Sequence, residues 1–247
     1  THPCLSCFRF KARKLLATAR IKNDMSGYFI TGTDTGAGKT VVTLGLMAAL
    51  KKTDASVLGM KPVASGSVRT SEGLRNEDAL QIQRQGDVHV PYELLNPYAF
   101  EPAIAPHFAS KEVGENIDLN KILSCYQTLA GLAETQIVEG VGGWRVPLGD
   151  NYSVSDLAKA LNLPIIVVVG LRLGCINHAV LTAEAISRDG LHLKAWVANQ
   201  LEPDYETLQA TVDCLSNIIP APMLGQVPFM NTVDIDRVSA CLNIDLL

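Results

Sequence analysis

The chain has 247 residues, of which 47% are hydrophobic and 19% are charged, and its formal net charge at pH 7 is −4. This length and composition predict one α/β domain with a sizeable core, and the acidic balance excludes a general nucleic-acid-binding surface. The central apolar run 163–169 contains Pro164 and is too short to cross a membrane, so we expect a buried parallel strand there. We therefore expect a cytoplasmic protein that binds neither nucleic acid nor membrane.

Residues 1–24 differ from the rest of the sequence, because they are rich in Lys and Arg and contain a single acid, Asp24. A basic segment of this kind is typical of organelle targeting. It equally fits sequence added or translated upstream of a natural start at Met25, which is the interpretation we favour. Cys4 and Cys7 have the spacing of zinc ligands, but a zinc site needs a second pair. We expect a leader over 1–24 and a functional domain over 25–247.

Strands and helices alternate along residues 25–247. Apolar runs predict strands at 28–30, 57–63, 136–140, 164–170, 195–199 and 223–227. Helical periodicity and capping residues predict helices at 41–50, 77–84, 117–134, 153–161, 177–188 and 205–218. The proline-rich residues 91–106 are expected to lack regular structure. The alternation predicts a single α/β domain whose mostly parallel sheet is covered by helices on both faces.

Polar residues lie at or just after the carboxyl ends of several of the predicted strands. They are Asp34, Lys61, Ser65, Glu139, Asn177 and Asn199. Ligands of parallel α/β sheets bind at the carboxyl ends of the strands. The functional site is therefore expected at this edge of the sheet.

A glycine-rich turn, Gly32-Thr33-Asp34-Thr35-Gly36-Ala37-Gly38-Lys39-Thr40, joins the first predicted strand to the first predicted helix. Such a turn points N–H groups at a phosphate, and the helix N-terminus adds favourable partial charge. Lys39 can then reach the β- and γ-phosphates, and the Thr40 hydroxyl can bind Mg²⁺. Five residues separate Gly32 from Gly38 where the usual motif has four. The turn is thus a variant phosphate-binding loop and predicts a P-loop NTPase-type fold.

Two carboxylates and a lysine are candidates to act beside the phosphates. Glu139 ends an apolar strand before Gly140-Val141-Gly142-Gly143, a position typical of a Mg²⁺ partner but also of a solvated strand end. Asp78 is either a second metal-side carboxylate or an ordinary acid on a helix face. Lys61 precedes Pro62 at a strand end and either supplies charge to a transferring phosphoryl group or lies on the surface.

The loop 170–178 follows the central predicted strand. Its free N–H groups suit an anion, and Asn177 is predicted to cap the next helix. Cys175 is interpreted as a packing residue because no paired base is evident, with a nucleophile as the alternative. His178 is expected to be structural.

The ordered motifs of the chain resemble those of the dethiobiotin synthetase family. They are Gly32-Thr-Asp-Thr…Gly-Lys-Thr40, Lys61-Pro-Val-Ala-Ser65-Gly, Arg75-Asn-Glu-Asp78-Ala, Asn96-Pro-Tyr, Pro106-His107, Val138-Glu139-Gly-Val-Gly-Gly-Trp144, Val169-Gly…Leu173-Gly-Cys-Ile-Asn177-His-Ala and Trp196-Val-Ala-Asn199. The match runs from Met25 nearly to the C-terminus, with weaker agreement at 144–145 and 228–242. In that family the five-residue spacing of the phosphate loop is normal.

The resemblance implies an ATP- and Mg²⁺-dependent ring closure in biotin synthesis. An amine of 7,8-diaminononanoate captures CO₂, supplied as CO₂ or bicarbonate, as a carbamate. ATP phosphorylates the carbamate to a carbamic-phosphoric anhydride. The second amine then closes the ureido ring and releases phosphate.

The resemblance also implies roles for individual residues. Lys39 and Lys61 would neutralise charge on the γ-phosphate and the carbamate, and Thr35 would hydrogen-bond the transferring group. Thr40, Asp78 and Glu139 would hold Mg²⁺, and Ser65 would contact the diamine end. The nucleotide-binding residues would be Gly36, Ala37, Gly38, Lys39, Thr40, Asp78, Glu139, Gly140, Gly142, Asn199, Gln200, Pro228, Phe229 and Met230. Of these, Asn199 and residues 228–230 would recognise adenine.

A homodimer with a shared active site is a further implication of the resemblance. In that arrangement Gly174, Cys175, Ile176 and Asn177 of one subunit would bind the substrate's carboxylate in the site of the partner subunit.

A ParA/MinD-type ATPase switch is the alternative from a different functional class. That group carries an additional lysine early in its phosphate loop, and residues 31–38 contain none. A related amidotransferase-type synthetase of the cobyrinic acid kind needs a glutaminase domain, for which we expect no room. To separate these functions, ADP release is measured in the presence of the diamine and bicarbonate and compared with ADP release in the presence of DNA or lipid vesicles.

Overall fold

The computed structural model describes residues 26–150 and 152–247. The expectations for the leader 1–24, with Cys4 and Cys7, fall outside the described residues. Within the described part, six strands form one sheet in which each neighbouring pair is parallel. In spatial order they are β10 (Met223–Val227), β9 (Leu193–Gln200), β8 (Ile165–Leu171), β1 (Ser26–Gly32), β7 (Thr135–Gly143) and β2 (Val57–Met60).

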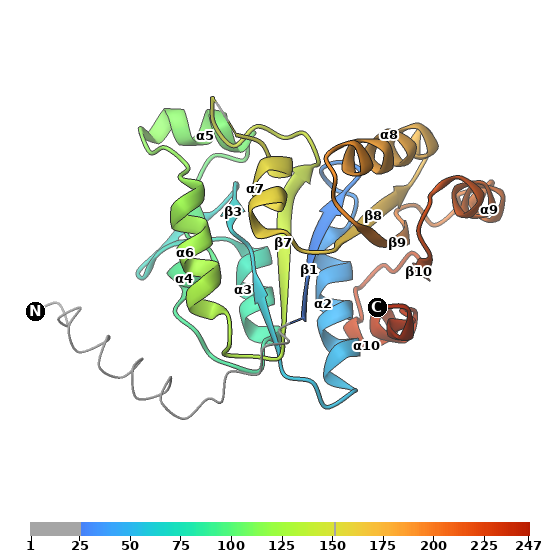
Figure 1. The fold of residues 1–247 in the computed structure, drawn as a ribbon, viewed down its shortest axis with the longest axis horizontal. Coiled ribbons are helices and arrows are strands. Elements are labelled where there is room, and N and C mark those ends of the chain that lie inside the picture. Colours follow the sequence, from blue (N-terminus) through green and yellow to red (C-terminus); the bar gives the residue numbers. More distant parts are fainter. Residues whose placement is uncertain (1–25, 151) are drawn as a thin grey trace, which may run out of the picture.

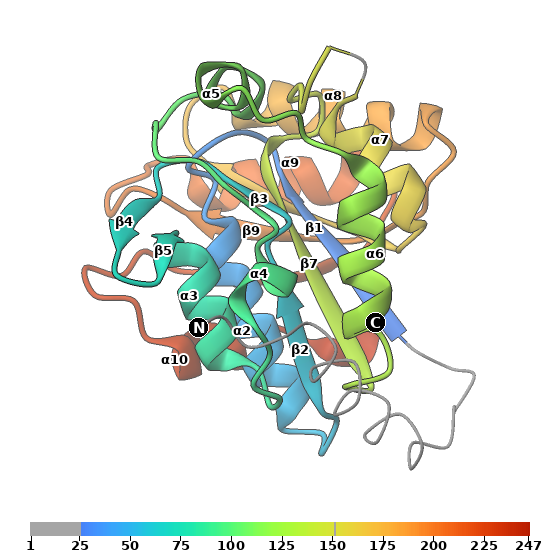
Figure 2. The ribbon, with the colours of Figure 1, turned by 90° about the vertical axis from the view of Figure 1, so that its left-hand side faces the viewer.

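Helices cover both faces of this sheet, as predicted. The longer ones are α2 (Lys39–Lys51), α3 (Glu77–Gln85), α6 (Leu119–Leu129), α7 (Val154–Leu161), α8 (Cys175–Arg188) and α9 (Leu208–Ile218). Figures 1 and 2 show α2 and α3 with α10 (Ile235–Ala240) on one face and α6, α7 and α8 on the other, and α9 packs against α8. Every residue of β8 is buried, because a central parallel strand has no face in water. No helix in the described ranges is both long and apolar enough to cross a bilayer.

The prediction that residues 91–106 lack regular structure is wrong. They contain α4 (Tyr92–Leu95), β6 (Tyr98–Ala99) and the start of α5 (Pro106–Val113). The prolines help to begin these helices, because Pro91 is the N-cap of α4 and Pro106 is the first residue of α5, where a missing N–H costs nothing.

Four short strands and, besides α4 and α5, two further helical segments were not predicted. Strand β3 (Val63–Ala64) pairs in parallel with β6, and β4 (Val68–Thr70) forms a hairpin with β5 (Gly73–Arg75). Near the C-terminus lie α10 and the 3₁₀ helix η1 (Ile244–Leu246). The predicted helix 117–134 is shorter than expected, since α6 ends at Leu129.

Asp189 ties the end of β7, helix α7 and helix α8 together. Its carboxylate accepts a hydrogen bond from Trp144 Nε1 at 2.8 Å and pairs with Arg145 at 2.9 Å and Lys159 at 3.0 Å. Burial raises the pKa of the Asp189 carboxyl, but the hydrogen bonds from Lys159 and Trp144 and the nearby positive charges outweigh it and hold the pKa below its ordinary value. The ionised form is therefore the stabilising one.

We expect Asp189→Asn to lower the free energy of unfolding at pH 7 by roughly 1–3 kcal/mol, because it removes charge-assisted contacts to Arg145 and Lys159. Since the folded-state pKa lies below the ordinary value of 3.8, this stabilisation is fully present above the ordinary pKa. It is lost as the pH falls through the folded-state pKa. Urea unfolding of both proteins at pH 7 and at decreasing acid pH measures this. Equal stability at pH 7 would show that the ion pairs contribute nothing.

Candidate active site

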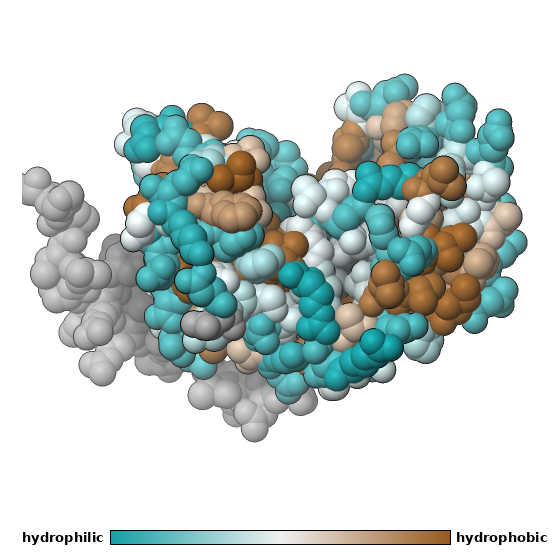
Figure 3. Space-filling view, turned by 90° about the horizontal axis from the view of Figure 1, so that it is seen from above, coloured by the Kyte–Doolittle hydropathy of each residue, from teal (hydrophilic) through white to brown (hydrophobic). Residues whose placement is uncertain are grey.

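A cavity of about 590 Å³ lies at the carboxyl ends of β1, β2 and β7. Seen from above, this side of the molecule is hollowed between the part that carries α5 and the part that carries α8 (Figure 3). The predicted site residues that line the cavity are Thr35, Gly36, Gly38, Lys39, Thr40, Lys61, Ser65, Asp78, Glu139 and Gly142. The structure therefore brings the predicted phosphate-loop, metal and lysine residues to one place.

The phosphate loop joins β1 to α2, and its glycines are required by its shape. Gly36 and Gly38 have φ of 83° and 88°, in the left-handed region that favours glycine. Gly38 is also the N-cap of α2, and a Cβ there would collide with the Asn199 side chain. Asn199 Nδ2 donates to the Ala37 carbonyl at 2.9 Å. The end of β9 thus holds the loop in a conformation in which its N–H groups remain available to a ligand.

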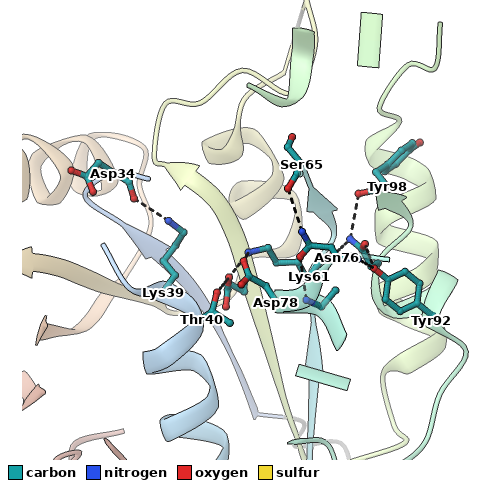
Figure 4. A network of polar contacts seen from close by, with 12 residues as sticks. Asp34, Lys39, Thr40, Lys61, Ser65, Asn76, Asp78, Tyr92 and Tyr98 are labelled. Atoms are coloured by element: carbon teal, nitrogen blue, oxygen red, sulfur yellow. Dashed lines mark hydrogen bonds and ion pairs between the residues drawn. The ribbon is translucent and has the colours of Figure 1, made fainter. Parts of the chain in front are cut away.

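Lys39 lies at the start of α2 with its ammonium inside the loop. Its Nζ donates to the Asp34 carbonyl at 3.0 Å, as Figure 4 shows. Burial, and then the charge of Lys61, lower the pKa of Lys39 to about 8, with Glu139 and Asp34 acting in the opposite direction. The Lys39 side chain therefore stays mostly protonated at pH 7. Its ammonium group is poorly solvated, which favours pairing with an anion.

Lys61 connects the two carboxylates of the cavity. Its Nζ donates to Asp78 Oδ2 at 3.1 Å and to Glu139 Oε1, and Thr40 Oγ1 donates to the same Glu139 oxygen at 2.9 Å. Glu139 is fully buried, and Lys61 is nearly so. Burial alone would lower the pKa of Lys61, but the charges of Glu139 and Asp78 outweigh it and raise that pKa. Lys61 is therefore a site residue and not the surface lysine that the sequence left open.

The residues around Glu139 fit a magnesium ion. Glu139 Oε2 is buried and has no hydrogen-bond partner in the described part of the molecule, so one carboxylate oxygen is available. Thr40 and Asp78 add a hydroxyl and a carboxylate, which are the hard oxygen ligands that Mg²⁺ prefers. No group of three or more His, Cys, Asp and Glu able to hold a metal occurs in residues 26–150 and 152–247. A metal here would thus need phosphate and water oxygens as well, which is the usual arrangement for Mg²⁺ beside a nucleotide.

The far wall of the cavity is largely apolar, and the sequence analysis missed most of it. It is built from Ala64, Ala103, Ile104, Ala105, Pro106, Val141 and Val146. Ser65 interrupts this wall, and its hydroxyl is buried without a hydrogen-bond partner among the described residues. Pro106-His107 was noted as a motif, but nothing local to Val146 marks it as a cavity residue. It becomes one because the chain after β7 folds back past Gly142.

The segment 174–177 does not line this cavity in its own chain. The prediction that Asn177 caps α8 is wrong, because the N-cap lies three residues earlier, at Gly174 with φ 94°, and the helix begins at Cys175. Asn177 is exposed in the first turn. Cys175 is 1% exposed and its N–H donates to the Arg172 carbonyl at 3.0 Å, as befits a packing residue. His178 Nδ1 lies 3.9 Å from Asp34 Oδ2, and the same carboxylate oxygen forms an ion pair with Arg172.

The residues assigned to adenine form a neighbouring group at the ends of β9 and β10. Val227 is in register with Asn199, and Phe229 N donates to Gln200 Oε1 at 3.4 Å. None of Asn199, Gln200 and residues 228–230 lines the cavity itself. Gly140 is also outside its wall and packs against the Phe29 ring.

The sequence of the chain is similar to that of known proteins over most of its length. A family model described as an AAA domain matches residues 26–237. The ATP-dependent dethiobiotin synthetase of Cellvibrio japonicus is 48% identical over 217 residues, covering 88% of this chain and 95% of that protein. The enzyme of the same name from Pseudomonas aeruginosa is 45% identical over 221 residues, covering 89% and 97%.

Solved structures with this fold include nucleotide-binding proteins of other functions. The septum site-determining protein MinD of Pyrococcus horikoshii, complexed with Mg-ADP, has a TM-score of 0.54 and 13% identity, covering 90% of this chain and 88% of that one. A ParA family ATPase from Chlorobium tepidum has a TM-score of 0.53 and 14% identity, covering 89% and 91%. Identities this low show a common fold and no more, so the predicted α/β P-loop fold is confirmed. From the sequence relatives, the chain belongs to the dethiobiotin synthetase family.

Proposed function

We propose that this chain closes the ureido ring of dethiobiotin from 7,8-diaminononanoate, CO₂ and ATP, with ADP and phosphate as the other products. The observation that carries the proposal is the single cavity that joins the phosphate loop, the Lys61–Glu139–Asp78 cluster and an apolar wall. A triphosphate, a metal and an aliphatic diamine can meet there. The family relatives are named for this activity.

The reaction has three steps. One amine adds to CO₂ and loses a proton, giving a carbamate. A carbamate oxygen attacks the γ-phosphorus and ADP leaves, which forms a carbamic-phosphoric anhydride. The second amine attacks the carbonyl carbon and loses a proton, the C–O bond to phosphate breaks, and the ring closes as phosphate departs with the carbamate oxygen.

The protein's part in this sequence is to position charges. Lys39 faces the phosphates, and its poorly solvated ammonium stabilises charge on the transferring group. Lys61 serves the carbamate and γ-phosphate from the opposite side, and Thr35 donates a hydrogen bond to the transferring group. Mg²⁺, held by Thr40, Asp78 and Glu139, would supply positive charge to the phosphate oxygens.

The substrate end of the site combines Ser65 with the apolar wall. The unpartnered Ser65 hydroxyl is available to an amine of the diamine. The wall of Ile104, Pro106, Val141 and Val146 keeps bulk water from the anhydride, which would otherwise be hydrolysed.

We further propose that two copies of the chain share each active site. The reacting amines must lie beside Lys39 and Lys61, so the substrate's distant carboxylate extends several methylenes away. Gly174 to Asn177 of a partner subunit would bind it at the N-terminus of α8. The exposure of this segment, with Leu173 at 93% and Ile176 at 36%, supports a role between copies.

The direct test is mass detection of dethiobiotin after incubation with ATP, Mg²⁺, bicarbonate and the diamine, with Lys39→Ala as the matched control. We expect product from the wild type and a loss of about 10²-fold or more in kcat for Lys39→Ala, because one preorganised charge is removed from the transferring phosphoryl group. Absence of product from folded wild-type protein would refute the proposed reaction. Near-wild-type turnover of the variant would refute the assignment of the phosphate loop.

Glu139→Gln tests the proposed metal ligand. The substitution keeps the size of the side chain but removes a charge that a hard cation prefers. We expect a large loss of activity and a higher Mg²⁺ concentration for half-maximal rate, with ATP and diamine saturating. A Mg²⁺ titration that overlays that of the wild type would show that Glu139 has only a structural role.

Complementation tests the shared site. Asn177→Ala alone is expected to raise the KM for the diamine more than it weakens ATP binding, because it removes remote positioning. After verified subunit exchange, a mixture of Asn177→Ala and Lys39→Ala proteins should regain activity, since one site of each heterodimer is intact. If no activity returns, each subunit's site is self-contained.

A further inference from the structure

A buried chain of hydrogen bonds runs from Asn76 in the cavity wall to the main chain of Lys61, and Asn76, Tyr92 and Asn96 have no part in the roles assigned so far. Asn76 Nδ2 donates to the Ser65 carbonyl at 3.2 Å, and Asn76 N donates to the Tyr92 hydroxyl at 2.7 Å. The Tyr92 hydroxyl donates to Asn96 Oδ1 at 2.8 Å, and Asn96 Nδ2 donates to the Lys61 carbonyl at 2.5 Å. Figure 4 shows this chain, which we call the Tyr92 brace. It begins and ends on the same segment, 61–65.

One end of the Tyr92 brace fixes the main chain of Lys61. Besides the bond from Asn96 to the Lys61 carbonyl, the Lys61 N–H donates to the Leu95 carbonyl at 3.0 Å. Both main-chain polar groups of Lys61 are therefore held by residues at the end of α4. The position from which the Lys61 side chain reaches Glu139 depends on them.

The other end of the Tyr92 brace fixes Asp78. Asn76 is the N-cap of α3, and its Oδ1 accepts from Ala79 N at 3.3 Å. Asp78 lies in the first turn of the same helix. Because the N–H of Asn76 bonds to Tyr92 and its amide bonds to Ser65, the start of α3 is tied to the opposite wall of the cavity. Asp78 Oδ2 lies 3.1 Å from Lys61 Nζ, and the two residues are thus connected both directly and through these bonds.

The Tyr92 hydroxyl is the central link because it both accepts and donates a hydrogen bond in a buried position. Asn76, Tyr92 and Asn96 are 7%, 6% and 3% exposed. Removing the hydroxyl would leave one donor and one acceptor unpaired. The ring itself has separate support, since the Arg75 guanidinium lies 4.2 Å from its centroid. A phenylalanine would therefore keep the packing and lose only the two hydrogen bonds.

We propose that Tyr92 is a positioning residue for phosphoryl transfer, which acts by holding Lys61 and Asp78 in their mutual geometry through Asn96 and Asn76. This inference rests on the proposed function of the cavity. It differs from the roles above in that Tyr92 touches neither nucleotide nor substrate. Small displacements of groups that act on a transferring phosphoryl reduce the rate steeply.

The chain offers a matched control, Tyr98. Its ring is 2% exposed, and its hydroxyl accepts a hydrogen bond from Asp118 N at 2.8 Å, at the N-cap of α6. Tyr92→Phe and Tyr98→Phe thus each remove one buried tyrosine hydroxyl bonded to a main-chain N–H at a helix N-cap. Only the first of these hydroxyls is linked to Lys61 and Asp78, since Tyr98 offers Asn96 just its main-chain carbonyl.

The experiment compares both variants with the wild type by melting temperature, kcat and the Mg²⁺ concentration that half-saturates ATP binding. We expect both variants to melt below the wild type, and Tyr92→Phe below Tyr98→Phe, because it loses two hydrogen bonds where Tyr98→Phe loses one. Tyr92→Phe should have a kcat about tenfold or more below that of Tyr98→Phe. It should also need about tenfold more Mg²⁺, the effect typical of losing a partner that orients a metal ligand. Agreement of the two variants within about twofold in kcat and in Mg²⁺ requirement would overturn the proposal.

Two further arms keep the result decisive. ATP binding is measured without diamine, so its Mg²⁺ requirement tests the Tyr92 brace independently of the reaction. If the wild type forms no dethiobiotin, that result counts against the proposed reaction and not against the brace. If Tyr92→Phe does not fold, Asn96→Asp replaces it, because aspartate keeps an oxygen for the Tyr92 hydroxyl but cannot donate to the Lys61 carbonyl. A lower kcat and a higher Mg²⁺ requirement for Asn96→Asp support the brace. Wild-type values for both overturn it.

Discussion

The Lys61 ammonium, held between the carboxylates of Glu139 and Asp78, is the interaction on which the arrangement of the site depends. Glu139 has no exposed surface, and a carboxylate buried without a cation costs several kcal/mol. Lys61 and the Thr40 hydroxyl compensate it from two other segments of the chain. Because the three groups come from β7, the end of β2 and the start of α2, their pairing fixes the phosphate loop against the sheet.

The same cluster places charge before any ligand arrives. Lys39 and Lys61 put two ammonium groups in one cavity, and burial, followed by the charge of Lys61, lowers the pKa of Lys39. Electrostatic groups that are already in place need little reorganisation during a reaction and act strongly where water is excluded. The wall opposite these charges is largely apolar. A phosphate-binding loop alone serves many ATPases, and it is the combination with this wall that favours chemistry on a small aliphatic substrate.

Sequence reasoning predicted the features that follow from local pattern. The alternation of strands and helices, the loop around Lys39 and the strand-end position of Glu139 all follow from short stretches of chain, and the structure brings them together. Sequence reasoning missed the elements that form only through contacts between distant segments, such as the pairing of β3 with β6. Tyr92 carries no local signal for the same reason, because its role arises only from bonds to Asn76 and Asn96.

The fate of the oxygen atoms of CO₂ tests the account most directly. The reaction is run with ¹⁸O-labelled CO₂, ATP, Mg²⁺ and the diamine, and it is stopped before the CO₂ exchanges its oxygen with water through bicarbonate. If a carbamate is phosphorylated in the cavity, the released phosphate carries one ¹⁸O and the ureido carbonyl of dethiobiotin retains another. Dethiobiotin formed together with unlabelled phosphate would contradict the account, because the carbamate oxygen would then not have attacked ATP.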